Sequence, residues 1–217
     1  MAKHRVSRSG SSIQDARAVA VLIHGRGATA EDILMLGQAV GAPDIALVAP
    51  HAPAGTWYPH SFLAPIGDNE PYLTRSLKVI SDVVHDVKSQ GMPSERIVLI
   101  GFSQGACLAL EYAARNAERF GGIAGLSGGL IGPRGSARDY AGSLFDTPVF
   151  LGCSDVDSHI PLDRVKESAT LLQRMGAQVT ERIYPGIPHT IIDDEVKAVR
   201  AMLASIPLRC KDGIHAA

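Results

Sequence analysis

A serine flanked by glycines lies between a predicted strand and a predicted helix at residues 101–105, where the sequence is GFSQG. An apolar run at 97–100 precedes it, and a helical pattern follows to about residue 118. A sharp turn in this position lifts a serine hydroxyl above the edge of a sheet. Small residues on either side let the strand and helix backbones pass closely. The pattern therefore predicts a nucleophilic serine at Ser103.

The same five-residue pattern occurs a second time around Ser127, in the sequence GLSGG. This serine also follows a predicted strand, but three glycines and Pro133 come after it, and such residues do not begin a helix. Without a following helix, Ser127 lacks both the sharp turn and the helix dipole that would favour an oxyanion. We therefore expect Ser103, and not Ser127, to be the nucleophile.

A nucleophilic serine needs a histidine as base, and the base needs a carboxylate that orients it. In one class of serine enzymes built on a parallel sheet, the chain order is serine, acid, histidine. Of the eight histidines, only His159 and His189 lie after the serine and before the C-terminal tail. Only His189 lies between the last predicted strand and the last predicted helix. The loop after the predicted strand at 149–151 offers two candidate acids, Asp155 and Asp157.

Asp155, Asp157 and His159 also form an Asp-x-Asp-x-His sequence, which could be interpreted as a set of metal ligands. The chain contains no second group of ligands with the spacing of a zinc site. We therefore predict no metal site. The positions of the two aspartates along the loop do not by themselves decide which one orients the histidine.

Acyl transfer also requires two preset hydrogen-bond donors for the oxyanion of the intermediate. One is expected to be the backbone N–H of Gln104, which follows the nucleophile at the start of its helix. The other is expected in the loop after the first strand, most simply the backbone N–H of Arg26. Gly25 and Gly27 flank this residue and allow the loop to approach closely.

Short apolar strands alternate with amphipathic helices along the chain. Strands are predicted at 18–23, 45–49, 97–100, 123–126, 149–151 and 179–184, and helices begin near residues 30, 71, 104, 161 and 193. This alternation predicts a mostly parallel sheet with helices on both faces and functional loops at the carboxyl ends of the strands. The Gly-rich stretch at 127–147 is too short for an inserted lid domain. We expect a flexible segment at 1–16, a single domain at 17–206 and a loosely held tail at 207–217.

Composition and charge exclude several classes of protein. The 217 residues include 21 Lys and Arg against 22 Asp and Glu, and this near-zero net charge argues against nucleic-acid binding. No apolar run reaches the length of about 18 residues that would predict stable membrane insertion. The first twelve residues lack a secretory signal, and Cys107, Cys153 and Cys210 are widely separated. These features predict a cytoplasmic protein with free thiols.

Four blocks of this sequence resemble the small carboxylesterase/phospholipase family of α/β-hydrolases, to which acyl-protein thioesterases and lysophospholipases belong. The blocks are LIHGRG at 22–27, GFSQG at 101–105, Asp157 four residues before Pro161, and YPGIPH at 184–189. The resemblance covers about residues 17–205. It implies the α/β-hydrolase fold without an inserted lid, and hydrolysis of esters or thioesters without a cofactor.

The resemblance also implies roles for individual residues. It implies a catalytic triad of Ser103, Asp157 and His189, with Arg26 and Gln104 as oxyanion donors. The chain departs from many relatives in having Pro188, and not glycine, directly before the histidine.

The choice of Asp157 has a second ground, because it lies four positions before Pro161, at which a helix begins. That length allows its carboxylate to turn back toward the histidine. Asp155 is closer to the end of its strand, and we expect its side chain to face solvent or to cap the loop.

The loop at 50–70 holds three aromatic residues within six positions, in the sequence WYPHSF at 57–62. Such residues could tie the loop to the core, or they could form the wall of a substrate pocket. We expect Trp57, Phe62 and Gly25 to contact the substrate. The segment 57–62 resembles a bacterial branch of small cytosolic hydrolases, and not the thioesterases that act on lipidated proteins.

Two other classes of function are alternatives to a serine esterase. The sequence GRGATA at 25–30 fits a dinucleotide-binding fingerprint, but no acid follows the second strand to bind a ribose. A binding protein that keeps the fold and has lost catalysis is the second alternative. We predict an esterase that cleaves small-molecule esters of short to medium acyl groups through an acyl-enzyme, with lysophospholipase or acyl-protein thioesterase activity as an alternative. It is expected to be a monomer or a homodimer.

Overall fold

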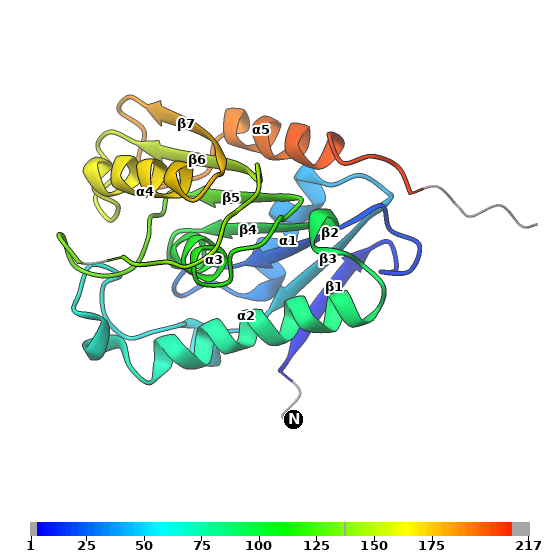
Figure 1. Cartoon of the computed structure of the whole chain (residues 1–217), viewed down its shortest axis with the longest axis horizontal. Coiled ribbons are helices and arrows are strands. Elements are labelled where there is room, and N and C mark those ends of the chain that lie inside the picture. The colour runs from blue at the N-terminus through cyan, green and yellow to red at the C-terminus, as the bar shows by residue number, and fades with distance from the viewer. Residues whose placement is uncertain (1–3, 137, 210–217) are drawn as a thin grey trace, which may run out of the picture.

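A seven-stranded sheet forms the centre of the computed structural model, which describes residues 4–136 and 138–209 (Figure 1). The strands are β1 (Val6–Gly10), β2 (Ala18–Ile23), β3 (Ile45–Pro50), β4 (Ile97–Phe102), β5 (Gly122–Leu126), β6 (Pro148–Ser154) and β7 (Gln178–Tyr184). Their order across the sheet is β1-β3-β2-β4-β5-β6-β7. Only β1 pairs antiparallel, with β3, and the other five pairings are parallel. The predicted fold class, a mostly parallel sheet, is confirmed.

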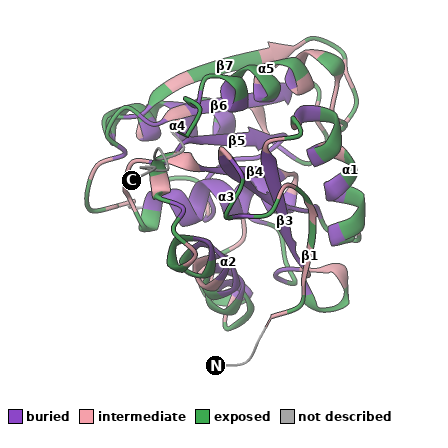
Figure 2. Ribbon diagram, turned by 90° about the vertical axis from the view of Figure 1, so that its right-hand side faces the viewer, coloured by how far each residue is buried: buried purple, intermediate pink, exposed green. Residues whose placement is uncertain are grey.

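Helices cover both faces of this sheet. They are α1 (Ala30–Val40), α2 (Tyr72–Ser89), α3 (Gln104–Arg115), α4 (Leu162–Arg174) and α5 (Asp193–Ala204). Helices α1 and α5 pack on one face, and α2, α3 and α4 share the hydrophobic core on the other. Figure 2 shows the central strands buried and β7 largely exposed at the edge. Burial on both faces explains why the central strands are apolar throughout, whereas β7 alternates.

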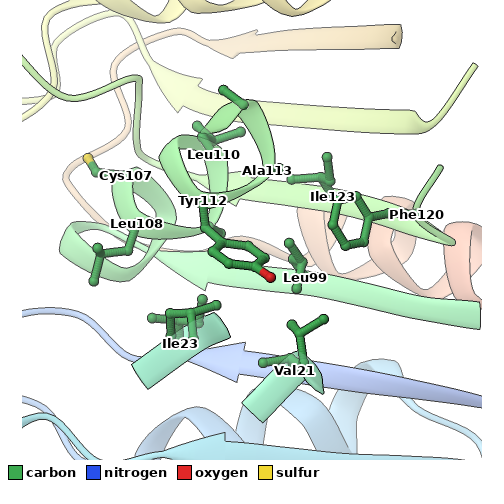
Figure 3. Close-up of a cluster of buried hydrophobic side chains, with 14 of the residues drawn as sticks. Val21, Ile23, Leu99, Cys107, Leu108, Leu110, Tyr112, Ala113, Phe120 and Ile123 are labelled. Carbon is green, nitrogen blue, oxygen red and sulfur yellow. The ribbon is translucent and has the colours of Figure 1, made fainter. Parts of the chain in front are cut away.

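The larger core lies between α3 and the centre of the sheet. Figure 3 shows Tyr112 and Leu108 of α3 above Val21 and Ile23 of β2, with Leu99 of β4 beside Tyr112. All five side chains are at most 4% exposed. This packing fixes α3, and therefore the turn that precedes it, relative to the strands on either side.

The N-terminal residues differ from the expectation of a flexible segment at 1–16. Residues Val6–Gly10 form the edge strand β1 on β3, and Ile13 and Ala16 are buried. The strand β1 lies at the edge of the sheet and is only partly buried, so its sequence, VSRSG, can be polar. It therefore has no apolar pattern that would predict a strand. Its pairing depends on β3, which lies about forty residues further along the chain.

The C-terminal tail predicted at 207–217 is described only as far as Arg209, and the rest, with Cys210, lies outside the described residues. Between β5 and β6, the described residues contain no helix or strand, in agreement with the absence of an inserted lid. None of the helices in the described residues has the length and the apolar character needed to span a membrane.

Candidate active site

Ser103 occupies a strained turn between β4 and α3. Its backbone has φ 55° and ψ −119°, a region that residues with a side chain rarely adopt. A Cβ atom added at Gly101 would collide with the carbonyl of Gly105, and one added at Gly105 would collide with the carbonyl of Ile23. The two glycines therefore permit the crossing of strand and helix that the sequence pattern predicted.

Ser103, His189 and Asp157, which come from three separate loops, form a continuous chain of hydrogen bonds. His189, between β7 and α5, has its Nε2 2.9 Å from Ser103 Oγ. Its Nδ1 lies 2.7 Å from Oδ2 of Asp157, in the loop after β6. The rings of Phe102 and His159 pack against the imidazole, with centroids 4.9 and 4.8 Å away. The imidazole is thus held between a hydroxyl and a carboxylate.

The two candidate acids have different partners. The second oxygen of Asp157, Oδ1, accepts hydrogen bonds from the backbone N–H groups of His159 (2.8 Å) and Ile160 (3.0 Å). Burial alone would raise the pKa of the Asp157 carboxyl, but the hydrogen bonds from His189, His159 and Ile160 outweigh it and lower the pKa. Asp155 instead accepts from the N–H of Gly186 at 2.8 Å, and so caps the loop that carries the histidine.

The remaining candidates from the sequence make no hydrogen bond to Ser103 or to the His189 ring among the described residues. Ser127 also has a positive φ, of 50°, but it is buried and no helix follows it. His159 touches His189 edge-on and does not approach the serine as a base. Within the described residues, no group of three or more His, Cys, Asp or Glu side chains could hold a metal ion. The side chains of Asp155, Asp157 and His159 therefore do not form a set of metal ligands.

The backbone N–H groups of Arg26 and Gln104 are available for a ligand. Neither donates to a protein acceptor among the described residues, and both residues line the cavity above Ser103. Gln104 begins α3, so the positive end of the helix dipole lies beside it. This arrangement suits a negatively charged oxygen.

The side chains of these two residues have a further role that the sequence did not indicate. The Gln104 amide accepts from the N–H of Trp57 (3.0 Å) and donates to the carbonyl of Tyr58 (2.8 Å). The Arg26 guanidinium donates to the carbonyls of Pro59 (2.9 Å) and His60 (2.7 Å). Both side chains thereby hold the aromatic segment against the serine turn. No sequence pattern links these positions, which are more than thirty residues apart.

Trp57 is an anchor of this loop and does not line the cavity. It is 1% exposed, and its indole N–H donates to the carbonyl of His24 at 2.8 Å. The expectation that Trp57 contacts substrate is therefore corrected, because its ring packs inward on the His24 ring. His24 is itself buried, and its Nδ1 and Nε2 contact the carbonyl of Gly25 and the N–H of Ala52. Burial lowers the pKa of His24, in keeping with an Nε2 that accepts a hydrogen bond from the N–H of Ala52.

A cavity of about 430 Å³ opens above Ser103. It is lined by Gly25, Arg26, Ala28, Tyr58, Pro59, His60, Ser61, Phe62, Phe102, Ser103, Gln104, Cys107, His159, Ile160 and His189. Gly25 and Phe62 thus lie where the sequence predicted substrate contacts. Tyr58 lines the cavity where Trp57 was expected, and its buried hydroxyl has no hydrogen-bond partner among the described residues.

The sequence profile of the phospholipase/carboxylesterase family matches residues 8–206. The chain belongs to this family. Acyl-protein thioesterase 1 of Saccharomyces cerevisiae is 28% identical over 219 residues, which cover 90% of this chain and 96% of that protein. Acyl-protein thioesterase 1 of Gibberella zeae is 32% identical over 140 residues, so the match spans 60% of this chain and 58% of that relative.

Solved structures agree with this family membership. A phospholipase/carboxylesterase from Dyadobacter fermentans is 42% identical, with a TM-score of 0.89 over 93% of this chain and 97% of that one. The esterase PE8 is 26% identical, with a TM-score of 0.80 over 94% of this chain and all of that one. The chain is a serine hydrolase of esters or thioesters with the α/β-hydrolase fold.

Proposed function

We propose that Ser103, His189 and Asp157 are the catalytic triad of this carboxylic ester hydrolase. The observation that carries the proposal is the His189 imidazole, which contacts Ser103 Oγ through one nitrogen and Asp157 through the other. This is the arrangement that a serine nucleophile, a general base and an orienting acid require. Cys107 also lines the cavity, but burial raises the pKa of its thiol to about 12 and keeps it protonated.

In the proposed mechanism, Ser103 Oγ attacks the ester carbonyl carbon while His189 Nε2 accepts the hydroxyl proton. The oxyanion that forms is bound by the backbone N–H groups of Arg26 and Gln104, and Asp157 stabilises the imidazolium. Collapse of the intermediate breaks the ester bond, and the imidazolium gives its proton to the leaving alcohol. Water then attacks the acyl-enzyme by the same steps and releases the acid.

We further propose that the substrate is a small-molecule ester with a short to medium acyl group. The volume of the cavity and the side chains of Phe62, Phe102 and Ile160 on its wall support this size. The buried free thiols of Cys107 and Cys153 support a reducing compartment such as the cytoplasm.

Labelling with a fluorophosphonate tests the nucleophile. We expect the probe to modify Ser103, and Ser103→Ala to lose both labelling and about 10⁶-fold in kcat. Ser127→Ala is the matched control, because Ser127 has the same five-residue pattern and a positive φ. It should keep most of both signals. Labelling that persists in Ser103→Ala and disappears in Ser127→Ala would refute the assignment.

A further inference from the structure

The ionisable side chains that line the cavity are strongly biased in charge. Arg26, His60, His159 and His189 contribute basic groups, and among the described residues no Asp or Glu lines the cavity. Asp157 lies beneath His189 and is fully buried, so it offsets the charge of the imidazole that it contacts. The charge of Arg26 has no such counterpart.

The Arg26 guanidinium is held in place without being neutralised. It donates to two backbone carbonyls, those of Pro59 and His60, which fix its position but carry no net charge. Within the described residues, the ion pairs do not include Arg26. A guanidinium has five N–H donors, so donors remain for a ligand after these two bonds.

One other feature of the same cavity favours an anion. Helix α3 is twelve residues long and directs its N-terminus toward the cavity at Gln104. Tyr58 also lines the cavity, and its buried hydroxyl makes no hydrogen bond of ordinary length and angle to another described residue. A preset guanidinium beside a helix N-terminus, with no Asp or Glu among the described residues that line the cavity, forms a site for a negatively charged group.

We propose that Arg26 makes this enzyme selective for esters that carry a carboxylate in addition to the scissile ester. The substrate class is then monoesters of dicarboxylic acids, or hydroxy acids acylated on the hydroxyl group, both of which keep a free carboxylate. The inference rests on the proposed function, because it assigns the substrate of the Ser103 site. A planar carboxylate matches the guanidinium, and its two oxygens can each accept an N–H. The carboxylate is bound and takes no part in bond breaking.

Matched pairs of esters test this selectivity and locate the charge. The first pair is the mono-p-nitrophenyl ester of glutaric acid and p-nitrophenyl valerate, which differ by a carboxylate on the acyl chain. The second is 4-butyryloxybenzoate and phenyl butyrate, which differ by a carboxylate on the leaving group. We expect kcat/KM for the charged member of at least one pair to exceed its neutral partner about tenfold at low salt. The excess should shrink as the salt concentration rises.

Variants at Arg26 are judged by the ratio of kcat/KM within each pair, because the residue also supplies a proposed oxyanion donor and holds the aromatic segment. Arg26→Gln should bring the ratio to about one, while Arg26→Lys, which keeps the charge, should retain part of it. Arg119→Gln is the control, because Arg119 also donates to a backbone carbonyl, that of Phe145, but does not line the cavity. It should leave the ratio unchanged.

Equal kcat/KM for both members of both pairs in the wild type would overturn the proposal. An unchanged ratio in Arg26→Gln would do the same. Neither result would affect the assignment of the nucleophile, since that depends on the loss of labelling in Ser103→Ala. Conversely, activity that survives Ser103→Ala would refute the proposed function whatever the ratio.

Discussion

Two aspartates lie within three residues of each other in the loop after β6, and their hydrogen bonds differ in kind. Asp157 accepts from the His189 ring and from two backbone N–H groups, and its side chain is fully buried. Asp155 accepts from a single backbone N–H, that of Gly186. Only Asp157 can therefore stabilise a positive charge on the imidazole directly.

Asp157→Asn should lower kcat by about 10⁴-fold with the fold intact, because an amide neither fixes the tautomer nor stabilises the imidazolium. Asp155→Asn is the matched control, since an asparagine oxygen can still accept from Gly186. We expect it to stay within about tenfold of the wild type. Steady-state kinetics with circular dichroism as a folding check distinguish the two. Comparable losses in both variants would contradict the assignment of the acid.

At the scale of elements, the crossing of β4 and α3 depends on glycine at two positions. Gly105→Ala should destabilise the protein by several kcal/mol, because the new Cβ would collide with the carbonyl of Ile23 and the backbone cannot yield. Gly67→Ala is the control, because a Cβ at that position meets no atom within 4 Å. Urea denaturation of both variants measures the effect. Equal free energies of unfolding for the two variants would contradict the prediction, because they would show that β4 and α3 can move apart to accept a methyl group.

The contact between α5 and β6 contains a buried carboxyl. Glu195 is 1% exposed, lies against Gly152 and accepts a hydrogen bond from the N–H of Ile192 at 3.0 Å. Burial raises the pKa of Glu195 from 4.5 to about 7. Between these values the folded state binds the proton more tightly than the unfolded chain, so the free energy of unfolding falls as the pH rises.

Glu195→Gln should remove this pH dependence, because a glutamine oxygen can still accept from Ile192 but the side chain does not ionise. Relative to the wild type, the variant should gain about 2 to 3 kcal/mol in free energy of unfolding between about pH 5 and pH 8.5. Urea denaturation at both pH values measures the gain. Glu181→Gln, at an exposed position on β7, is the control and should leave the wild-type dependence in place. Parallel pH profiles for wild type and Glu195→Gln would contradict the prediction.

At the scale of the whole molecule, acyl preference depends on how much chain the protein can cover. No helix or strand is present in the described residues between β5 and β6, so the walls of the cavity come from the segment at 57–62, from other loops and from the junction of β4 and α3. Each buried methylene contributes about 0.8 kcal/mol, and methylenes beyond the cavity contribute little. A p-nitrophenyl ester series from two to sixteen carbons should therefore show kcat/KM rising to a medium length and then levelling.

Phe62→Ala should weaken the dependence of kcat/KM on chain length, because Phe62 forms part of the cavity wall. Phe145→Ala is the control, since Phe145 is 61% exposed and does not line the cavity. The same ester series measures both. If the sixteen-carbon ester had the highest kcat/KM, the limit set by the cavity would be wrong.

Features that depend on neighbours along the chain were predictable from the sequence alone. The turn at Ser103 follows from a strand, two glycines and a helix that are adjacent in sequence. The alternation of strands and helices follows from local apolar patterns, and with it the meeting of the functional loops at one edge. The position of His189 between the last strand and the last helix predicts that it lies at this edge as well.

Only the tertiary structure decided features that depend on how distant segments pack. It placed the Asp157 carboxylate, and not that of Asp155, against the His189 ring, because the direction of a loop side chain depends on the opposite loop, 32 residues away. In the folded structure Trp57 packs inward against His24, and the Arg26 and Gln104 side chains contact the aromatic segment at 57–62. The tertiary structure also added β1, whose backbone hydrogen bonds exist only once β3 is present. Such contacts form between groups that are remote in sequence, and no local pattern of residues encodes them.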